Sequence, residues 1–266
     1  MNVIALSATD LMLAASLVLV LALLSLLMQL QLAGRLVIAA VRTTVQLVLI
    51  GLVLKALFAN VQLVWVTALA VFMLAVAGRE VMARQHRRFG GIWGYGLGTM
   101  SMFVSAFATT VFALVFIIGT VPWYEPRYAI PLLGMMLGNT MNGVALALDR
   151  LTTSAWQQRG VIEAHLTLGH EWRTAVGGIT RDSVRVGMIP IINAMAAAGI
   201  VSLPGMMTGQ ILSGTPPLEA VKYQILIMFM ISAGTGFATL AASWIGARRL
   251  FDERCRLRLD RLVVGK

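Results

Sequence analysis

The chain alternates between long apolar runs and short polar segments. Seven runs are predicted to cross a hydrocarbon core of about 30 Å as helices. They cover residues 11–28, 36–54, 63–77, a stretch that follows the glycine-rich segment 90–98 and ends near 119, 128–148, 188–212 and 221–245. The alternating pattern of strands is absent, and the bilayer core offers no partners to unpaired backbone groups. The pattern therefore predicts an all-α polytopic membrane protein with seven transmembrane helices, organised as a single domain over residues 1–266.

Composition and charge indicate a membrane protein and predict how the chain is oriented in the membrane. Hydrophobic residues make up 59% of the chain and charged residues 12%, whereas about a quarter of residues are charged in soluble domains. The net charge of +10 does not predict nucleic-acid binding, because the basic residues flank the apolar runs and leave no soluble domain to dock a duplex. Cytoplasmic loops instead collect lysine and arginine. An outside N-terminus and a cytoplasmic C-terminus put 18 of the 21 basic residues in the cytoplasm, so this orientation is predicted.

The longest polar insert, residues 149–188, lies between the fifth and sixth runs on the predicted cytoplasmic side. Apolar or small side chains recur in it at helical spacing and predict an amphipathic helix over 161–176. They are Val161, Ala164, Leu168, Trp172, Ala175 and Ile179. Gly177 and Gly178 should weaken or end this helix, and a second helical piece should lead to Pro190, near a helix start or a kink. The first helix could rest on lipid or dock a cytoplasmic partner; acidic and basic residues beside a narrow stripe favour docking.

The sixth run has the composition of a broken helix. It combines Pro204 with Gly205, Gly209 and Gly214, and membrane helices are interrupted in this way where they line a cavity. We expect a discontinuous helix that bends between 202 and 205. Pro190, Pro204 and Gly205 are therefore candidate gate or hinge residues.

Polar and thioether side chains in the fifth and sixth runs are candidates for a substrate path. They are Asn139, Asn142, Asn193, Met206, Met207 and Gln210, with Met135 and Met136 nearby. Amides are costly in lipid, so they should face the bundle or a cavity, where they either hydrogen-bond between helices or contact substrate. Thioethers suit soft metals but also serve as flexible packing. These runs lack the imidazole and carboxylate groups that bind harder metals tightly.

Four segments carry a resemblance to known transporters. EAHLTLG, at 163–169, looks like the opening of the EAA loop of ABC importer permeases. The run GIVSLPGMMTGQILSGTPPLEAVKYQILIMF, together with MLGNTMNG and VRTTVQLVLIGLVL, resembles the FetB family more specifically. That family comprises permease subunits of ABC transporters assigned to iron export, and it is related to plant aluminium-resistance permeases. The resemblance extends from the second run to the seventh.

The resemblance implies a multi-pass permease of the bacterial inner membrane that promotes iron efflux. Such a permease would form a homodimer and bind two copies of a separate cytoplasmic ATPase subunit, which would hold ATP and Mg²⁺. This chain would then bind no cofactor itself and use no resident metal. The resemblance and the apolar stripe together place the contact with the ATPase on five residues of the insert: Glu163, Ala164, Leu168, Gly169 and Trp172.

Other kinds of chemistry lack their motifs. The chain has no GxxxxGK[ST] sequence, so it has no P-loop for ATP hydrolysis. His170 and Glu171 begin a zinc-protease motif, but position 174 is Thr rather than the second His. A transport subunit rather than an enzyme is therefore expected. A partner-independent channel or secondary carrier for a metal or small solute is the alternative, and a membrane anchor that regulates another protein is a third possibility.

Overall fold

A computed structural model describes residues 7–265 of the chain. Its internal contacts divide it into two parts. The first comprises the residues up to Gln62 together with Leu212–Gly214, and the second comprises Leu63–Ile211 and the residues from Thr215 onward.

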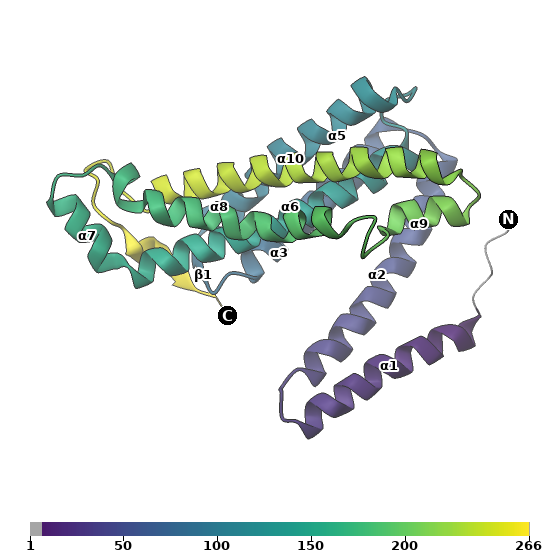
Figure 1. The fold of residues 1–266 in the computed structure, drawn as a ribbon, viewed down its shortest axis with the longest axis horizontal. Coiled ribbons are helices and arrows are strands. Elements are labelled where there is room, and N and C mark those ends of the chain that lie inside the picture. The colour runs from purple at the N-terminus through teal and green to yellow at the C-terminus, as the bar shows by residue number, and fades with distance from the viewer. Residues whose placement is uncertain (1–6, 266) are drawn as a thin grey trace. The chain divides into compact units, whose positions relative to one another are not determined.

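The first part is a helical hairpin of α1 (Ala8–Leu27) and α2 (Ala33–Ala59) (Figure 1). A capping box begins α1, because the Ser7 hydroxyl accepts from the Asp10 N–H at 3.3 Å and the Asp10 carboxylate accepts from the Ser7 N–H at 2.8 Å. Both helices were predicted from the first two apolar runs. The second helix is longer than predicted at both ends.

The second part contains the remaining elements. The segment after α3 leads through β1 and α4 into two π-helical stretches, η1 and η2, which flank α5. The bounds are α3 (Leu63–Ala83), β1 (Arg87–Phe89), α4 (Ile92–Met102), η1 (Phe103–Phe107), α5 (Ala108–Phe112), η2 (Ala113–Ile118), α6 (Pro126–Gln157), α7 (Arg159–Thr167), α8 (Trp172–Ala197), α9 (Gly205–Leu212), α10 (Pro217–Arg249), the 3₁₀ turn η3 (Leu259–Arg261) and β2 (Leu262–Val264).

Six helical runs of the described residues are long and apolar enough to cross a membrane. They are α1, α2, α3, the continuous run Ile92–Ile118, α6 and α10. The seventh predicted run is shared between the end of α8 and α9, and the chain between Ala197 and Gly205 is not helical. The predicted interruption is therefore present, although it begins earlier than residue 202. Seven crossings with the N-terminus outside remain a prediction.

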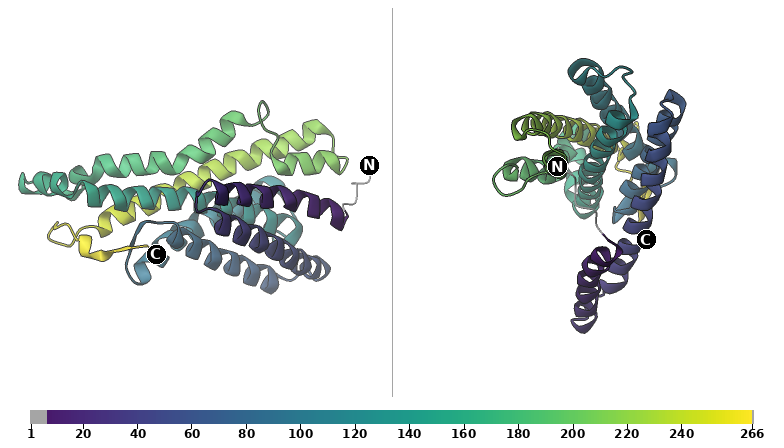
Figure 2. Two further views of the ribbon diagram at one scale, coloured as in Figure 1. Left: turned by 90° about the horizontal axis from the view of Figure 1, so that it is seen from below. Right: turned by 90° about the vertical axis from the view of Figure 1, so that its right-hand side faces the viewer.

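The core of the second part is formed where α6, α8 and α10 run alongside one another (Figures 1 and 2). A Cβ atom added to Gly187 of α8 would lie 2.6 Å from the Gly143 carbonyl oxygen of α6 and 2.9 Å from the Ala147 Cβ. The methyl groups of Thr235 and Thr239 of α10 pack against the same glycines, and Thr239 is fully buried. Small residues thus let three helix backbones approach closely, as is common between membrane helices.

The insert at 149–188 differs from its prediction. α6 continues to Gln157, and the predicted single helix over 161–176 is wrong, because α7 ends at Thr167 and α8 begins at Trp172. Gly169 ends α7 with a φ of +83°, the left-handed conformation in which glycine commonly terminates a helix.

The predicted helix end at Gly177 and Gly178 is also wrong, since α8 runs through both glycines and through Pro190. Burial of Ala175, Val176 and Ile179 holds the first turns of α8 on the bundle. That burial offsets the cost of about 1 kcal/mol that each glycine carries inside a helix.

The close approach of α6 and α8 can be tested with two glycines of the same helix. Gly187→Ala should destabilise the protein by about 1–3 kcal/mol, because the new methyl group has no space. Gly178→Ala is the matched control, since no atom lies within 4 Å of its added Cβ and alanine favours a helix. Thermal unfolding in detergent should show a lower midpoint for Gly187→Ala alone. Equal midpoints for the two variants would contradict the packing.

Candidate functional site

α7 is the most exposed helix at one end of the bundle, where α6 ends and α8 begins (Figure 1). Only Gln158 separates it from α6, and four residues separate it from α8. Its buried anchor is Ile162, at 1% exposure. The neighbouring Val161, which the sequence pattern placed on the apolar stripe, is 56% exposed. The predicted stripe therefore has the wrong phase here, because α7 is a separate short helix.

Four of the five predicted contact residues share this exposed segment. Glu163 and Ala164 are exposed on α7, and Leu168 and Gly169 are exposed in the turn that follows. Leu168 is 75% exposed although it is apolar. We call these four residues the α7 surface. These four exposed residues are accessible to a partner outside the bundle.

Trp172, the fifth predicted contact residue, lies elsewhere. It begins α8 and packs against the end of α10, with ring centroids 6.4 Å from Trp244 and 6.2 Å from Phe251. The guanidinium of Arg248 also lies over its ring, at 5.6 Å. Trp172 is therefore half-buried and attaches the start of α8 to α10.

A histidine pair spans the turn between α7 and α8. The Nδ1 atoms of His165 and His170 are 2.9 Å apart, and the rings lie with centroids 5.2 Å apart. One ring must donate and the other accept in this hydrogen bond, so it cannot form when both rings are doubly protonated. The pair closes the turn around Gly169. Sequence reasoning missed it, because His170 was considered only as part of a protease motif.

Polar contacts fix the same end of α6 to its neighbours. Asp149 accepts a hydrogen bond of 2.6 Å from the His86 N–H, and its carboxylate is 3.2 Å from the His86 Nδ1. Arg150 forms an ion pair of 2.7 Å with Asp182 of α8. Thr152 donates to the Arg87 carbonyl at 2.7 Å. These contacts hold α6, α8 and the segment before β1 together beyond the apolar part of the bundle.

The predicted path residues on α6 make specific hydrogen bonds. Asn139 donates from Nδ2 to the carbonyl of Met135, one turn earlier in the same helix, at 2.8 Å. The Asn142 Oδ1 accepts from Nη1 of Arg84, which follows the end of α3. Asn193 is exposed on α8 instead. Asn142 thus bonds to a segment outside α6, as the helix-packing interpretation expects, whereas Asn139 bonds only within α6.

Two methionines come together across helices. Met135 of α6 and Met206 of α9 line a small cavity with residues of α10, among them Tyr223. Met207 and Gln210 lie half-buried on α9. Across the described residues, no group of three or more His, Cys, Asp and Glu side chains could hold a metal ion.

The break before α9 is closed by local hydrogen bonds. Gly199, with a φ of +82°, donates its N–H to the Ser202 carbonyl at 2.9 Å. The Pro204 carbonyl accepts from the N–H of Thr208 at 3.1 Å and from its hydroxyl at 3.2 Å. Pro204 and Gly205 therefore stand where the helix restarts, whereas Pro190 lies inside α8.

Comparison with known proteins identifies relatives over nearly the whole chain. The model of a family described as "Uncharacterised protein family (UPF0014)" matches residues 8–251. The UPF0014 membrane protein slr1647 of Synechocystis is 37% identical over 233 residues, which cover 86% of this chain and 87% of that protein. No solved structure matches.

Two further relatives have more informative names. The Escherichia coli protein named "Probable iron export permease protein FetB" is 30% identical over 230 residues, covering 83% of each chain. The Arabidopsis thaliana protein ALUMINUM SENSITIVE 3 is 30% identical over 228 residues, covering 86% of this chain and 81% of that protein. Relatives named as membrane proteins and the long apolar helices agree that this is an all-α, multi-pass membrane protein.

The attachment of Trp172 can be separated from the exposed surface by mutation. Trp172→Ala should remove aromatic contacts worth about 0.5–1.5 kcal/mol each and loosen the start of α8. Limited proteolysis in detergent should then cleave faster between residues 168 and 171. Leu168→Ala is the control, since its side chain is 75% exposed and its loss should leave the cleavage rate unchanged. Equal rates for the wild type and Trp172→Ala would show that Trp172 does not anchor this helix.

Proposed function

The chain belongs to the UPF0014 family, and on that basis we propose that it is the transmembrane permease subunit of an ABC transporter. The separate ATPase subunit would bind ATP and Mg²⁺ in the cytoplasm. Two copies of the permease would pair in the bacterial inner membrane, each with one ATPase. The observation that carries this proposal is the α7 surface, which is exposed on a helix joined closely to two long helices of the bundle.

Iron or a related metal is the proposed cargo. The support is the name of the Escherichia coli relative, a probable iron export permease, and the match of this chain to most of its length. The path would pass the amides and thioethers around Asn139, Asn142, Asn193, Met206, Met207 and Gln210. Amides and thioethers bind ferrous iron less well than imidazole and carboxylate do. The metal would therefore be held weakly during passage or move in a chelated form.

Coupling would pass from the α7 surface into α8. An ATPase bound at Glu163, Ala164, Leu168 and Gly169 would shift α7 when it closes on ATP. The turn of four residues to Trp172 is short, and Trp172 is attached to α10. The shift would therefore be transmitted to the start of α8 and to the end of α10 together.

The unbroken helix α8 is suited to transmit such a shift along the bundle. With no break at Gly177 and Gly178, the helix can move as one body from Trp172 as far as Pro190. Pro190 removes one backbone donor inside that helix and is the point at which it would bend. The movement would reach the non-helical segment 198–204, where Pro204 and Gly205 would act as the gate.

The proposal predicts that the α7 surface is needed for coupling but not for folding. Leu168→Ala and Glu163→Gln should each weaken the ATPase contact by about tenfold, equivalent to ~1.4 kcal/mol. Both should lower the ATPase activity of the co-purified complex in proteoliposomes while membrane insertion stays normal.

The matched control for coupling is Gly178→Ala, an exposed position on α8 with open space around it. It should couple as the wild type does. Full coupling in both α7 variants would refute the docking role. If no ATPase subunit co-purifies with the wild-type permease, the channel or secondary-carrier alternative is favoured instead.

A further inference from the structure

The segment after α10 is a folded cap rather than a free basic tail. Its last strand, β2, pairs antiparallel with β1, so that Leu262 faces Phe89 and Val264 faces Arg87. The Arg258 N–H donates to the Leu250 carbonyl at 2.7 Å, and the Gly265 N–H donates to the His86 carbonyl at 2.8 Å. The cap is therefore tied both to the end of α10 and to the segment that precedes α4.

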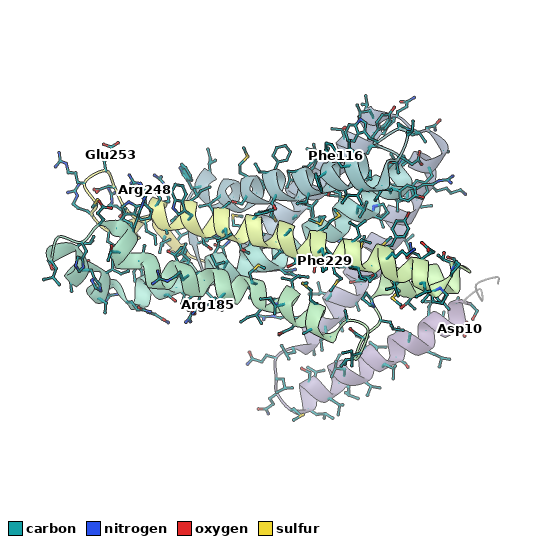
Figure 3. The ribbon with its side chains drawn as sticks, turned by 45° about the horizontal axis from the view of Figure 1, so that its top comes forward. Asp10, Phe116, Arg185, Phe229, Arg248 and Glu253 are labelled. Atoms are coloured by element: carbon teal, nitrogen blue, oxygen red, sulfur yellow. The ribbon has the colours of Figure 1, made fainter. Side chains whose placement is uncertain are left out.

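A cavity of about 700 Å³ lies between this cap, the end of α10 and the start of α4. Figure 3 shows Arg248 and Glu253 at this end of α10. Six arginines line the cavity: Arg248, Arg249, Arg254, Arg256, Arg258 and Arg261. Asp252 and Glu253 are its acidic residues. Even with the nearby Asp260 counted, arginines outnumber carboxylates two to one. We call this space the arginine cavity.

Several of these arginines are held in fixed positions. Arg256 pairs with Asp252 at 2.8 Å, and Arg258 makes two hydrogen bonds of 2.8 Å to the carboxylate of Asp260. The Arg261 Nη1 donates to the carbonyls of Arg249 and Phe251 at 2.8 and 3.2 Å. Such contacts organise the guanidinium groups in advance of any ligand.

The carboxylates that hold the arginines stay ionised at neutral pH. Hydrogen bonds from the Arg258 guanidinium lower the pKa of Asp260 to about 2. The Arg256 backbone N–H lowers the pKa of Asp252 in the same direction. The cap therefore keeps its internal ion pairs throughout the physiological pH range.

The Nε–H group of Arg249 donates no hydrogen bond within residues 7–265. The guanidinium of this arginine lies over the Trp93 ring at 4.5 Å from the centroid. Its Nε atom is buried. A buried donor of a charged group is costly to leave unsatisfied. An anion in the arginine cavity would offset the excess positive charge of the guanidinium groups around it.

We propose that the arginine cavity binds a phosphate group, carried by the headgroup of an anionic phospholipid or by a free phosphate compound. Guanidinium groups recognise phosphate through paired N–H donors. A volume of about 700 Å³ is in the range of small-ligand sites, roughly 300–1,000 Å³. The cavity also lies at the end of α10, a helix long and apolar enough to span the bilayer, where lipid headgroups are expected.

An excess of arginine at the end of a membrane helix usually indicates only that this end lies on the cytoplasmic side of the membrane. Arginines with that role are solvated and need no fixed geometry. Arg261 is instead held by backbone carbonyls of this end of the chain, and Arg249 is stacked on an indole with a buried unmet donor. The proposed site does not depend on the transport activity proposed above.

The test measures binding to the purified full-length protein with two kinds of probe. In one arm, phosphatidylglycerol or phosphatidylcholine is titrated into detergent-solubilised protein, and bound lipid is counted by native mass spectrometry. In the other arm, inorganic pyrophosphate is titrated into protein in phosphatidylcholine nanodiscs, and the shift in unfolding midpoint is measured. Binding of phosphatidylglycerol alone identifies the headgroup as the source, and binding of pyrophosphate alone identifies a free phosphate compound.

Variants decide whether binding occurs in the arginine cavity. Arg249→Ala and Arg254→Ala should each weaken binding of the active probe by about tenfold. Arg254 is exposed, so its replacement tests the site without risk to the fold. Arg185→Ala, at an exposed position of α8 that does not line the cavity, is the matched control and should bind as the wild type does (Figure 3). Wild-type protein that binds neither probe, or cavity variants that bind as tightly as the wild type, would overturn the proposal.

Discussion

The close approach of α6 and α8 at Gly143 and Gly187 is the contact on which the rest of the bundle depends. Lipid gives helices little hydrophobic reason to associate, so close van der Waals packing between small residues must hold them together. Thr235 and Thr239 of α10 cover the same point and make it a junction of three helices. Because no side chain fits between the two glycines, the lateral positions of these helices are set within narrow limits.

This junction explains how distant parts of the second unit are connected. α8 stays helical from Trp172 to Ala197 because α6 and α10 support it. One end of α8 is therefore attached to the exposed α7, and the other leads into the interruption before α9. The ion pair between Arg150 and Asp182 and the contact of Asp149 with His86 reinforce the α7 end. A continuous helix thus connects the exposed α7 to the non-helical segment 198–204, as the proposed coupling would need.

The cap formed by residues 250–265 places the arginine cavity at the same end of the bundle as α7. Its strand pairing with β1 and the contact of Trp172 with Phe251 bring α8, α10 and the segment before α4 together. Arg248 contributes both to the arginine cavity and to the contact with Trp172. From the sequence, the arginines at the end of the chain predict only which side of the membrane that end lies on. In the structure they line a cavity beside the proposed coupling region.

The apolar runs by themselves determined the long helices, since about 20 consecutive apolar residues must form a helix in lipid. The proline and glycines near Gly205 likewise predicted a break. Local signals failed in the insert, where tertiary packing of α8 outweighs the low helix propensity of Gly177 and Gly178, and Gly169 ends a helix instead. The buried face of α7 and the pairing of residues 262–264 with 87–89 were decided only by the tertiary structure. They depend on contacts between segments far apart in the chain, which no local pattern encodes.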